Sequence, residues 1–112
     1  MTVIWHNPRC SKSRATLAIV EDHGPVEIRK YLEDAPSEAD IRGVLAQLGI
    51  PAIQLMRTGE AEFKELGLSK TDSDDVLIAA MTKAPKLIER PVVITDKGAR
   101  IGRPPECVKE IL

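Results

Sequence analysis

The sequence is poor in aromatic residues and in cysteine. Only three of its 112 residues are aromatic, namely Trp5, Tyr31 and Phe63, so its core has to be built mainly from leucine, isoleucine, valine and alanine. Its two cysteines, Cys10 and Cys107, stand nearly a chain length apart. That spacing is neither a disulfide framework nor a CxxC pair, and we expect a protein of the reducing cytoplasm.

The sequence also lacks long apolar runs and an excess of charge of either sign. No stretch approaches the ~20 apolar residues that a membrane span needs. Sixteen basic residues stand against 17 acidic ones, for a formal charge of −1, so we expect neither a membrane nor a nucleic-acid partner. With only two histidines beside the two cysteines, a metal site is not expected either. What is present, 43% hydrophobic and 29% charged residues, is typical of one compact globular domain.

The first third of the chain predicts a βαβ unit. Residues 2–5 (TVIW) form a short β-branched and aromatic run that ends at a proline turn, as a buried strand does. Apolar residues then recur at helical spacing over residues 11–23, and the pair Gly24-Pro25 ends the helix. Residues 26–31 (VEIRKY) alternate in polarity and predict a second strand, which a right-handed crossover would place parallel to the first.

The remainder predicts a helical block followed by a β-hairpin and a helix. Residues 37–88 contain helix caps and apolar stripes but no strand pattern. Strands follow at 91–95 and 99–102, joined by a turn at Asp96-Lys97-Gly98, and a last helix covers 104–112. We therefore predict a single α/β domain, residues 1–112, with a helical insertion at about 37–88.

The segment HNPRCSKSR, residues 6–14, places Cys10 at the predicted N-cap of the first helix. The N–H groups of Lys12 and Ser13 are then available to a thiolate, and a helix N-terminus with cations near it lowers a cysteine pKa from ~8.5 into the range of about 3.5–7.5. The same N–H groups favour a bound oxyanion. Neighbouring residues that we expect to support the loop are His6, Ser11, Ser13 and Arg14.

A structural role for this cysteine fits the loop residues as well as a reactive one does. Three known thiol or phosphate motifs are absent. A tyrosine-phosphatase loop needs arginine six positions after its cysteine, where this chain has Thr16, and no Gly-Lys-Ser/Thr nucleotide loop is present. Ser13 stands where a CxxC motif would have its second cysteine, so Cys10 would have to act alone in its loop.

Together with three later motifs, the cysteine loop resembles the glutaredoxin-coupled arsenate reductase family. The later motifs are LMR at 55–57, ERPVVIT at 89–95 and GRPPE at 102–106, so the resemblance runs almost from end to end. It implies a thioredoxin-like fold with a helical insertion, in agreement with the order of elements predicted above. It also implies an arsenate reductase.

The resemblance assigns roles to individual residues. It implies that Cys10 is the nucleophile, that His6 is the loop histidine, and that Arg57, Arg90 and Arg103 bind the oxyanion and its thiol adducts. Arginine suits such a ligand because its planar donors match a tetrahedral oxyanion. Pro91 is implied to be the cis-proline beside the cysteine loop. The implied co-substrate is glutathione and the implied protein partner is glutaredoxin, with no tightly bound cofactor and no metal; we expect a monomer.

One departure from the family pattern keeps other functions open. The loop continues CSKSR where arsenate reductases of this type commonly read Cys-Gly-Thr-Ser. The broader family includes Spx-like regulators that bind a protein partner, although these usually carry the CxxC motif that Ser13 breaks. A glutathione-dependent thiol oxidoreductase without arsenate activity is the other alternative. Cys107 matches no role, and we expect it to be a buried or half-buried helix residue.

Overall fold

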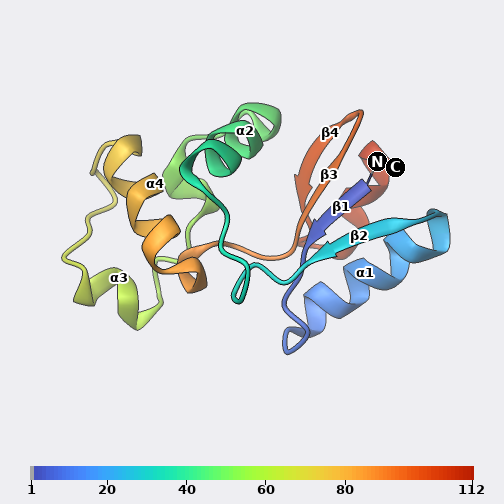
Figure 1. Ribbon diagram of the computed structural model, residues 1–112, viewed down its shortest axis with the longest axis horizontal. Coiled ribbons are helices and arrows are strands. Elements are labelled where there is room, and N and C mark those ends of the chain that lie inside the picture. Colours follow the sequence, from blue (N-terminus) through green and yellow to red (C-terminus); the bar gives the residue numbers. More distant parts are fainter. Residues whose placement is uncertain (1) are drawn as a thin grey trace. The chain divides into compact units, whose positions relative to one another are not determined.

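The computed structural model describes residues 2–112 and divides into two compact units. The first unit holds the sheet and is built from the chain up to Asp34 together with Arg90–Leu112. The second unit is helical and comprises Ala35–Glu89. Figure 1 labels the elements of both units. The helical unit coincides, to within two residues at its start and one at its end, with the insertion predicted at 37–88.

The sheet unit is a mixed four-stranded sheet of thioredoxin-like topology, with strand order β2-β1-β3-β4. The central pair is β1 and β3: Ile4 of β1 lies opposite Val93 in antiparallel register and opposite Ile28 of β2 in parallel register. Strands β3 and β4 form the predicted hairpin. The strands are β1 Thr2–Trp5, β2 Val26–Arg29, β3 Val92–Thr95 and β4 Gly98–Ile101.

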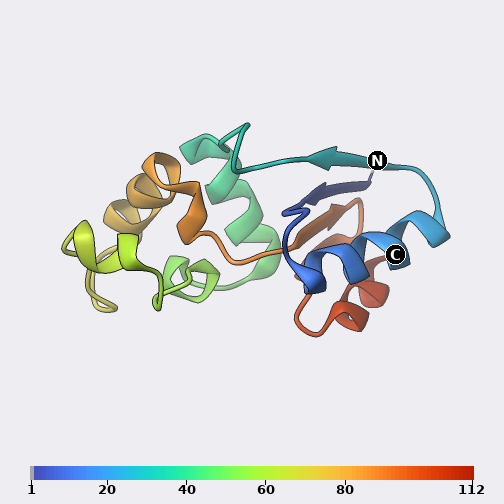
Figure 2. The same cartoon turned by 90° about the horizontal axis from the view of Figure 1, so that it is seen from below.

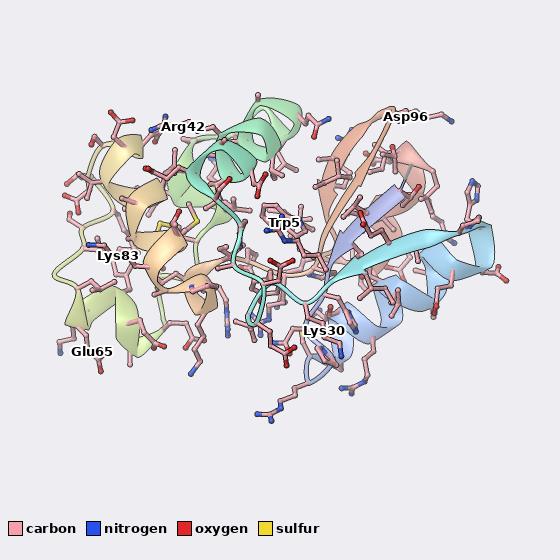
Figure 3. All side chains as sticks on the ribbon, viewed as in Figure 1. Trp5, Lys30, Arg42, Glu65, Lys83 and Asp96 are labelled. Atoms are coloured by element: carbon pink, nitrogen blue, oxygen red, sulfur yellow. The ribbon has the colours of Figure 1, made fainter. Side chains whose placement is uncertain are left out.

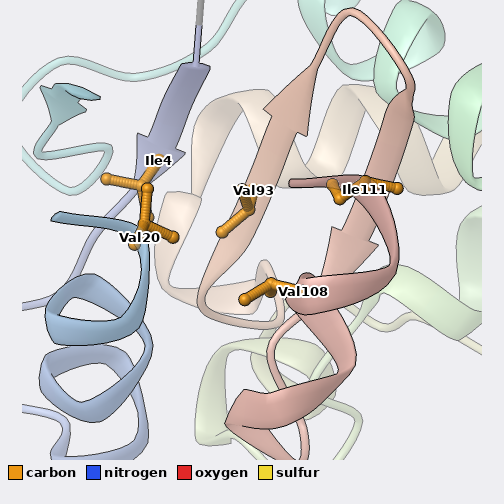
Figure 4. Close-up of a cluster of buried hydrophobic side chains, with 5 residues drawn as sticks. All are labelled: Ile4, Val20, Val93, Val108 and Ile111. Atoms are coloured by element: carbon orange, nitrogen blue, oxygen red, sulfur yellow. The ribbon is translucent and has the colours of Figure 1, made fainter. Parts of the chain in front are cut away.

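One face of this sheet is covered by helix α1, Ser11–His23, and by the 3₁₀ helix η3, Pro105–Ile111, as Figure 2 shows. Five aliphatic side chains from β1, α1, β3 and η3 meet between them and are almost fully buried (Figure 4). Burial of each such side chain stabilises the fold by about 1.5–3 kcal/mol relative to exposure. The packing therefore fixes the position of α1, and with it the cysteine loop. The cluster is Ile4, Val20, Val93, Val108 and Ile111.

Helices of the helical unit begin and end at capping residues that the sequence predicts. Ser37 and Asp40 form a capping box at the start of α2, Glu38–Leu48, and Gly49 ends this helix in the left-handed conformation at φ 69°. The Ser73 hydroxyl caps α4, Asp74–Lys83. The other elements are the 3₁₀ helices η1 and η2, at Ala52–Leu55 and Pro85–Leu87, and the short helix α3, Ala61–Glu65.

Several element boundaries differ from the prediction. Strands β3 and β4 lie at Val92–Thr95 and Gly98–Ile101 rather than at 91–95 and 99–102. Strand β2 ends at Arg29 rather than at residue 31, because the Lys30 carbonyl accepts the N–H groups of Glu33 and Asp34 and closes a turn there. The predicted last helix is a 3₁₀ helix beginning at Pro105. Among residues 2–112, no helix is both long enough and apolar enough to cross a membrane.

Candidate active site

Cys10 stands where the chain leaves β1 and enters α1. It is the N-cap residue of α1, in extended conformation at φ −96° and ψ 123°, and it is half-buried. Its carbonyl oxygen accepts the N–H of Arg14, the first hydrogen bond of the helix. The N–H groups of the first turn have no partner within the helix, so they are oriented toward the sulfur. The predicted N-cap position of Cys10 is confirmed.

The loop around Cys10 is held by its own hydrogen bonds. Ser13 is fully buried, and its hydroxyl lies 2.7 Å from His6 Nδ1 and accepts the Asn7 N–H at 3.0 Å. The Asn7 carbonyl in turn accepts the Cys10 N–H at 3.0 Å. On the outside, Arg14 donates to the carbonyl of Pro8 at 2.9 Å. The Ser13 hydroxyl thus contacts His6 and Asn7, and the part of Ser13 that interacts with the sulfur is its backbone N–H.

These surroundings lower the pKa of the Cys10 thiol below its ordinary value. Burial is the largest single influence, and by itself it raises the pKa because it disfavours the charged form. The N–H groups of Ser13 and Lys12 and the Arg90 guanidinium, which both hydrogen-bonds and attracts the sulfur, act in the opposite direction and together outweigh burial. By geometric criteria the Cys10 side chain accepts no capping hydrogen bond. The thiolate is the nucleophilic form of cysteine, so this site favours reaction.

His6 is held in its neutral form. Its side chain is 5% exposed, and burial lowers its pKa, with further lowering by the positive charges of Lys30 and Arg14 against an opposing effect of Glu21. Neutral imidazole adds no charge to the site. The contact between His6 and Ser13 orients the loop.

Arg90 approaches the loop from another segment of the sheet unit, and Arg103 contacts Arg90. Arg90 precedes β3 and interacts with the Cys10 sulfur. Arg103 follows β4, and its guanidinium donates to the Arg90 carbonyl at 3.4 Å. The peptide bond between Arg90 and Pro91 is cis, and so is that between Arg103 and Pro104, for which the sequence had suggested nothing.

Gly102 is a positioning residue that the sequence reasoning passed over. Its N–H donates to the Pro91 carbonyl at 2.9 Å. A Cβ atom at this position would lie 2.5 Å from Thr16 Oγ1 and 2.8 Å from Pro91 Cγ, closer than side chains approach. Only glycine lets the segment that carries Arg103 pass between α1 and Pro91. The one available signal was a glycine directly before an Arg-Pro pair.

Arg57 belongs to the helical unit. Its N–H donates to the Leu87 carbonyl at 2.7 Å, beside a bridge that pairs Met56 with Ile88. Its guanidinium forms an ion pair with Glu60 at 2.6 Å. Backbone hydrogen bonds therefore join the segment of Arg57 to residues 87–89, which directly precede Arg90 in the sequence.

Two further features concern metals and the second cysteine. Within residues 2–112, no three histidine, cysteine or acidic side chains gather where they could hold a metal ion. Cys107 is half-buried in η3 and forms no disulfide, as expected for a helix residue.

The sheet topology, the cis-proline and the cysteine at the N-cap of α1 define a thioredoxin-like protein. Over residues 5–111 the sequence matches the model of the ArsC family, and the chain belongs to that family. It is 45% identical over 114 residues to the arsenate reductase of Haemophilus influenzae, covering 98% of this chain and 97% of that protein.

Two other relatives are similar over their full length. The uncharacterized protein YfgD of Escherichia coli K12 is 48% identical over 112 residues, covering 97% of this chain and 94% of the relative. The solved structure of an arsenate reductase from Vibrio cholerae superposes with a TM-score of 0.94 at 49% identity and covers 99% of this chain and 97% of that one. The family resemblance and the thioredoxin-like fold inferred from the sequence are thus confirmed.

Proposed function

We propose that this protein is a cytoplasmic arsenate reductase that uses Cys10 as its single nucleophile, glutathione as co-substrate and glutaredoxin as protein partner. The observation that carries the proposal is the placement of Cys10 at the N-terminus of α1 with Arg90 on its sulfur. That arrangement combines a thiolate with donors for a tetrahedral anion. Relatives named arsenate reductase, 39–45% identical over nearly all of this chain, support the choice of substrate.

In the first step, the Cys10 thiolate attacks the arsenic of arsenate, a sulfur–arsenic bond forms, and an arsenate oxygen leaves as water. The N–H groups of the first turn of α1, Arg90 and Arg103 hold the oxyanion. Arg57 enters the proposal through the family resemblance alone. Arginines and a helix N-terminus together neutralise the charge of such an anion without a metal ion.

Arsenic is reduced in the second step. A glutathione thiolate attacks the Cys10 sulfur, a sulfur–sulfur bond forms, and the electron pair of the sulfur–arsenic bond stays with arsenic, which leaves as arsenite. Glutaredoxin then attacks the Cys10–glutathione disulfide and releases the Cys10 thiolate. Two thiols have supplied the two electrons, so no tightly bound cofactor takes part.

A coupled assay tests the proposal. Purified protein, arsenate, glutathione, glutaredoxin and glutathione reductase are mixed, and NADPH oxidation is followed. We expect oxidation that requires arsenate, glutaredoxin and Cys10. Oxidation that proceeds equally with thioredoxin and its reductase in place of the glutathione system would contradict the proposed partners.

The two alternatives have distinct outcomes in the same assay. A general glutathione-dependent oxidoreductase would reduce mixed disulfides without any response to arsenate. A regulator that only binds a protein partner would show neither activity. Either result would replace the proposed function.

A further inference from the structure

A cavity of about 250 Å³ lies beside the cysteine loop in the sheet unit. Residues 6–9 form one wall, and Lys30, Leu32 and Glu33, which follow β2, form the other (Lys30 is labelled in Figure 3). Asn7, which lines the cavity, accepts the Cys10 N–H. The cavity therefore adjoins the backbone of the reactive residue. A larger cavity of about 340 Å³, at the other end of α1 beside His23 and Leu112, lies about 20 Å away along that helix.

Both walls of the cavity are fixed by hydrogen bonds from backbone N–H groups. The Arg9 N–H donates to Asn7 Oδ1 at 3.0 Å on the first wall. On the second, the Lys30 carbonyl accepts the N–H groups of Glu33 and Asp34 at 2.9 Å each. The N–H of His6 donates to the Arg29 carbonyl at 2.8 Å and joins the two walls. A ligand would meet a formed site and lose little free energy in ordering it.

The charged side chains around the cavity have both signs and can interact with a ligand. Arg9 and Lys30 contribute two positive charges and Glu33 one negative charge, and all three side chains are exposed. None of the three forms an ion pair or side-chain hydrogen bond with another of residues 2–112. Leu32, 43% exposed, adds an apolar surface between them.

We propose that this cavity binds glutathione next to Cys10. The inference rests on the proposed use of glutathione as co-substrate and adds the place where it binds. Glutathione carries two carboxylates, one ammonium group and a short thiol-bearing side chain. Its charges are complementary to those of Arg9, Lys30 and Glu33, and occupancy of the cavity would bring its sulfur to the Cys10 loop. Such complementarity selects for the tripeptide over a neutral thiol.

The first test follows exchange with disulfides and needs no arsenate. In a Cys107→Ser background, the Cys10 thiolate attacks oxidised glutathione, forms the Cys10–glutathione disulfide and expels one glutathione thiolate. The rate is compared with that for bis(2-hydroxyethyl) disulfide, which is neutral. We expect Lys30→Glu to slow the glutathione reaction about fivefold, the effect of about one exposed charge contact, and to leave the neutral reaction unchanged. Lys70→Glu, an exposed lysine of the helical unit, is the matched control.

A second variant separates the ammonium contact from the carboxylate contacts. Glu33→Gln should slow the reaction with oxidised glutathione but not that with dithiodipropionate, which has carboxylates and no ammonium group. Equal slowing of all three disulfides by the variants would mean that they alter Cys10 itself, and it would overturn the proposal. So would rates that none of the variants changes.

Binding is mapped independently with S-methylglutathione, which cannot form a disulfide. Added to full-length Cys10→Ser protein, it should shift the backbone amide NMR signals of His6, Asn7 and Arg9 and of residues 30–33. Shifts confined to the cavity beside His23, or no shifts, would contradict the assigned site. If these results are obtained but arsenate is not reduced, the proposed glutathione site is supported and only the proposed oxyanion substrate is wrong. If arsenate is reduced but glutathione has no advantage over the neutral disulfide, the cavity proposal fails alone.

Discussion

His6 Nδ1 and Ser13 Oγ lie 2.7 Å apart and join the end of β1 to the first turn of α1. Both residues are buried, and the same hydroxyl also accepts the N–H of Asn7. The loop that carries Cys10 is therefore closed by one internal serine rather than by the surface residues around it.

Replacing this serine should loosen the loop. Ser13→Ala leaves the Asn7 N–H and the buried imidazole without their partner, and loss of such a hydrogen bond costs about 1–3 kcal/mol of unfolding free energy. Ser11→Ala, at an exposed position of the same turn, should cost far less. Urea unfolding of both variants measures the difference, and equal losses would mean that the His6–Ser13 contact contributes nothing specific.

The neutral state of His6 makes stability depend on pH. The folded protein lowers the pKa of this group, so between the folded and unfolded pKa values the unfolded chain binds more protons. The contribution of His6 to the free energy of unfolding should be complete above about pH 6.5 and should fall as the pH drops below that value. Urea titrations from about pH 8 to pH 5 measure this slope. His6→Gln should reduce the slope; an unchanged slope in this variant would assign the effect to another group.

Arg90 should control the reactivity of Cys10. Removing its guanidinium in Arg90→Ala takes away a hydrogen bond and a positive charge from the sulfur, so the pKa of Cys10 should rise and alkylation near neutral pH should slow. The rate of iodoacetamide modification against pH, in a Cys107→Ser background and in low-phosphate buffer, gives the pKa directly. Arg42→Ala, which removes an exposed arginine paired with Asp75, is the control. An unchanged profile in Arg90→Ala would show that the helix N–H groups act alone.

Arsenate, phosphate or sulfate should protect Cys10 from alkylation. The motive is that the first-turn N–H groups and Arg90 act on the sulfur and that Arg103 contacts the Arg90 carbonyl. Protection should weaken in Arg90→Ala, in Arg103→Ala and, as the family resemblance implies, in Arg57→Ala, but not in Arg42→Ala. Anion-soaked crystals with the three arginines on a face remote from Cys10 would refute the assignment.

The two cysteines should behave differently in turnover. Cys10→Ser puts a hydroxyl, which stays protonated, in place of the thiolate, so arsenate reduction should vanish while the fold survives. Cys107→Ser changes a half-buried residue of η3 and should keep most activity, with a stability loss on the order of 1 kcal/mol. Equal loss of activity in both variants would indicate that Cys107 resolves Cys10 through an internal disulfide.

Gly102 offers a test of close packing. Gly102→Ala forces a Cβ atom against Thr16 and Pro91, and overpacking of this kind costs about 1–3 kcal/mol. Because the same clash displaces Arg103, activity should fall as well. Gly43→Ala is the matched control: nothing lies within 4 Å of its Cβ position, and alanine in a helix interior is favoured by about 0.5–1 kcal/mol. Destabilisation of the same size in both would rule out the steric explanation.

Local signals made most of the fold predictable. Gly24-Pro25 ended α1, Ser37 began α2, and the Asp96-Lys97 turn joined β3 to β4, as expected. The end of β2 was missed because Tyr31 is an aromatic residue typical of strands, although the alternation already breaks at the adjacent polar residues Arg29 and Lys30. Tyr31 is buried, 1% exposed, from within a turn, and tertiary packing decides that position.

The site was predictable only where local structure creates it. The N-cap position of Cys10 follows from a strand, a proline turn and a helix in series. The approach of Arg90 to the sulfur depends on how β3 pairs with β1, whose Val3 lies opposite Ile94 of β3. Because these strands are far apart in sequence, the family resemblance rather than the local pattern suggested this approach. No sequence pattern predicted the hydrogen bonds by which Ser13 closes the cysteine loop, because the burial of Ser13 depends on how α1 packs on the sheet.

The dependence of Cys10 on the first turn of α1 makes this thiol a reporter of the native state. Most half-buried cysteines, Cys107 among them, become more accessible to reagents when a protein unfolds. At mildly acidic pH, Cys10 should instead react more slowly when the protein unfolds, because unfolding disperses the N–H groups and the guanidinium that favour its thiolate. A single labelling experiment at low reagent concentration would then count folded molecules by one cysteine and unfolded molecules by the other.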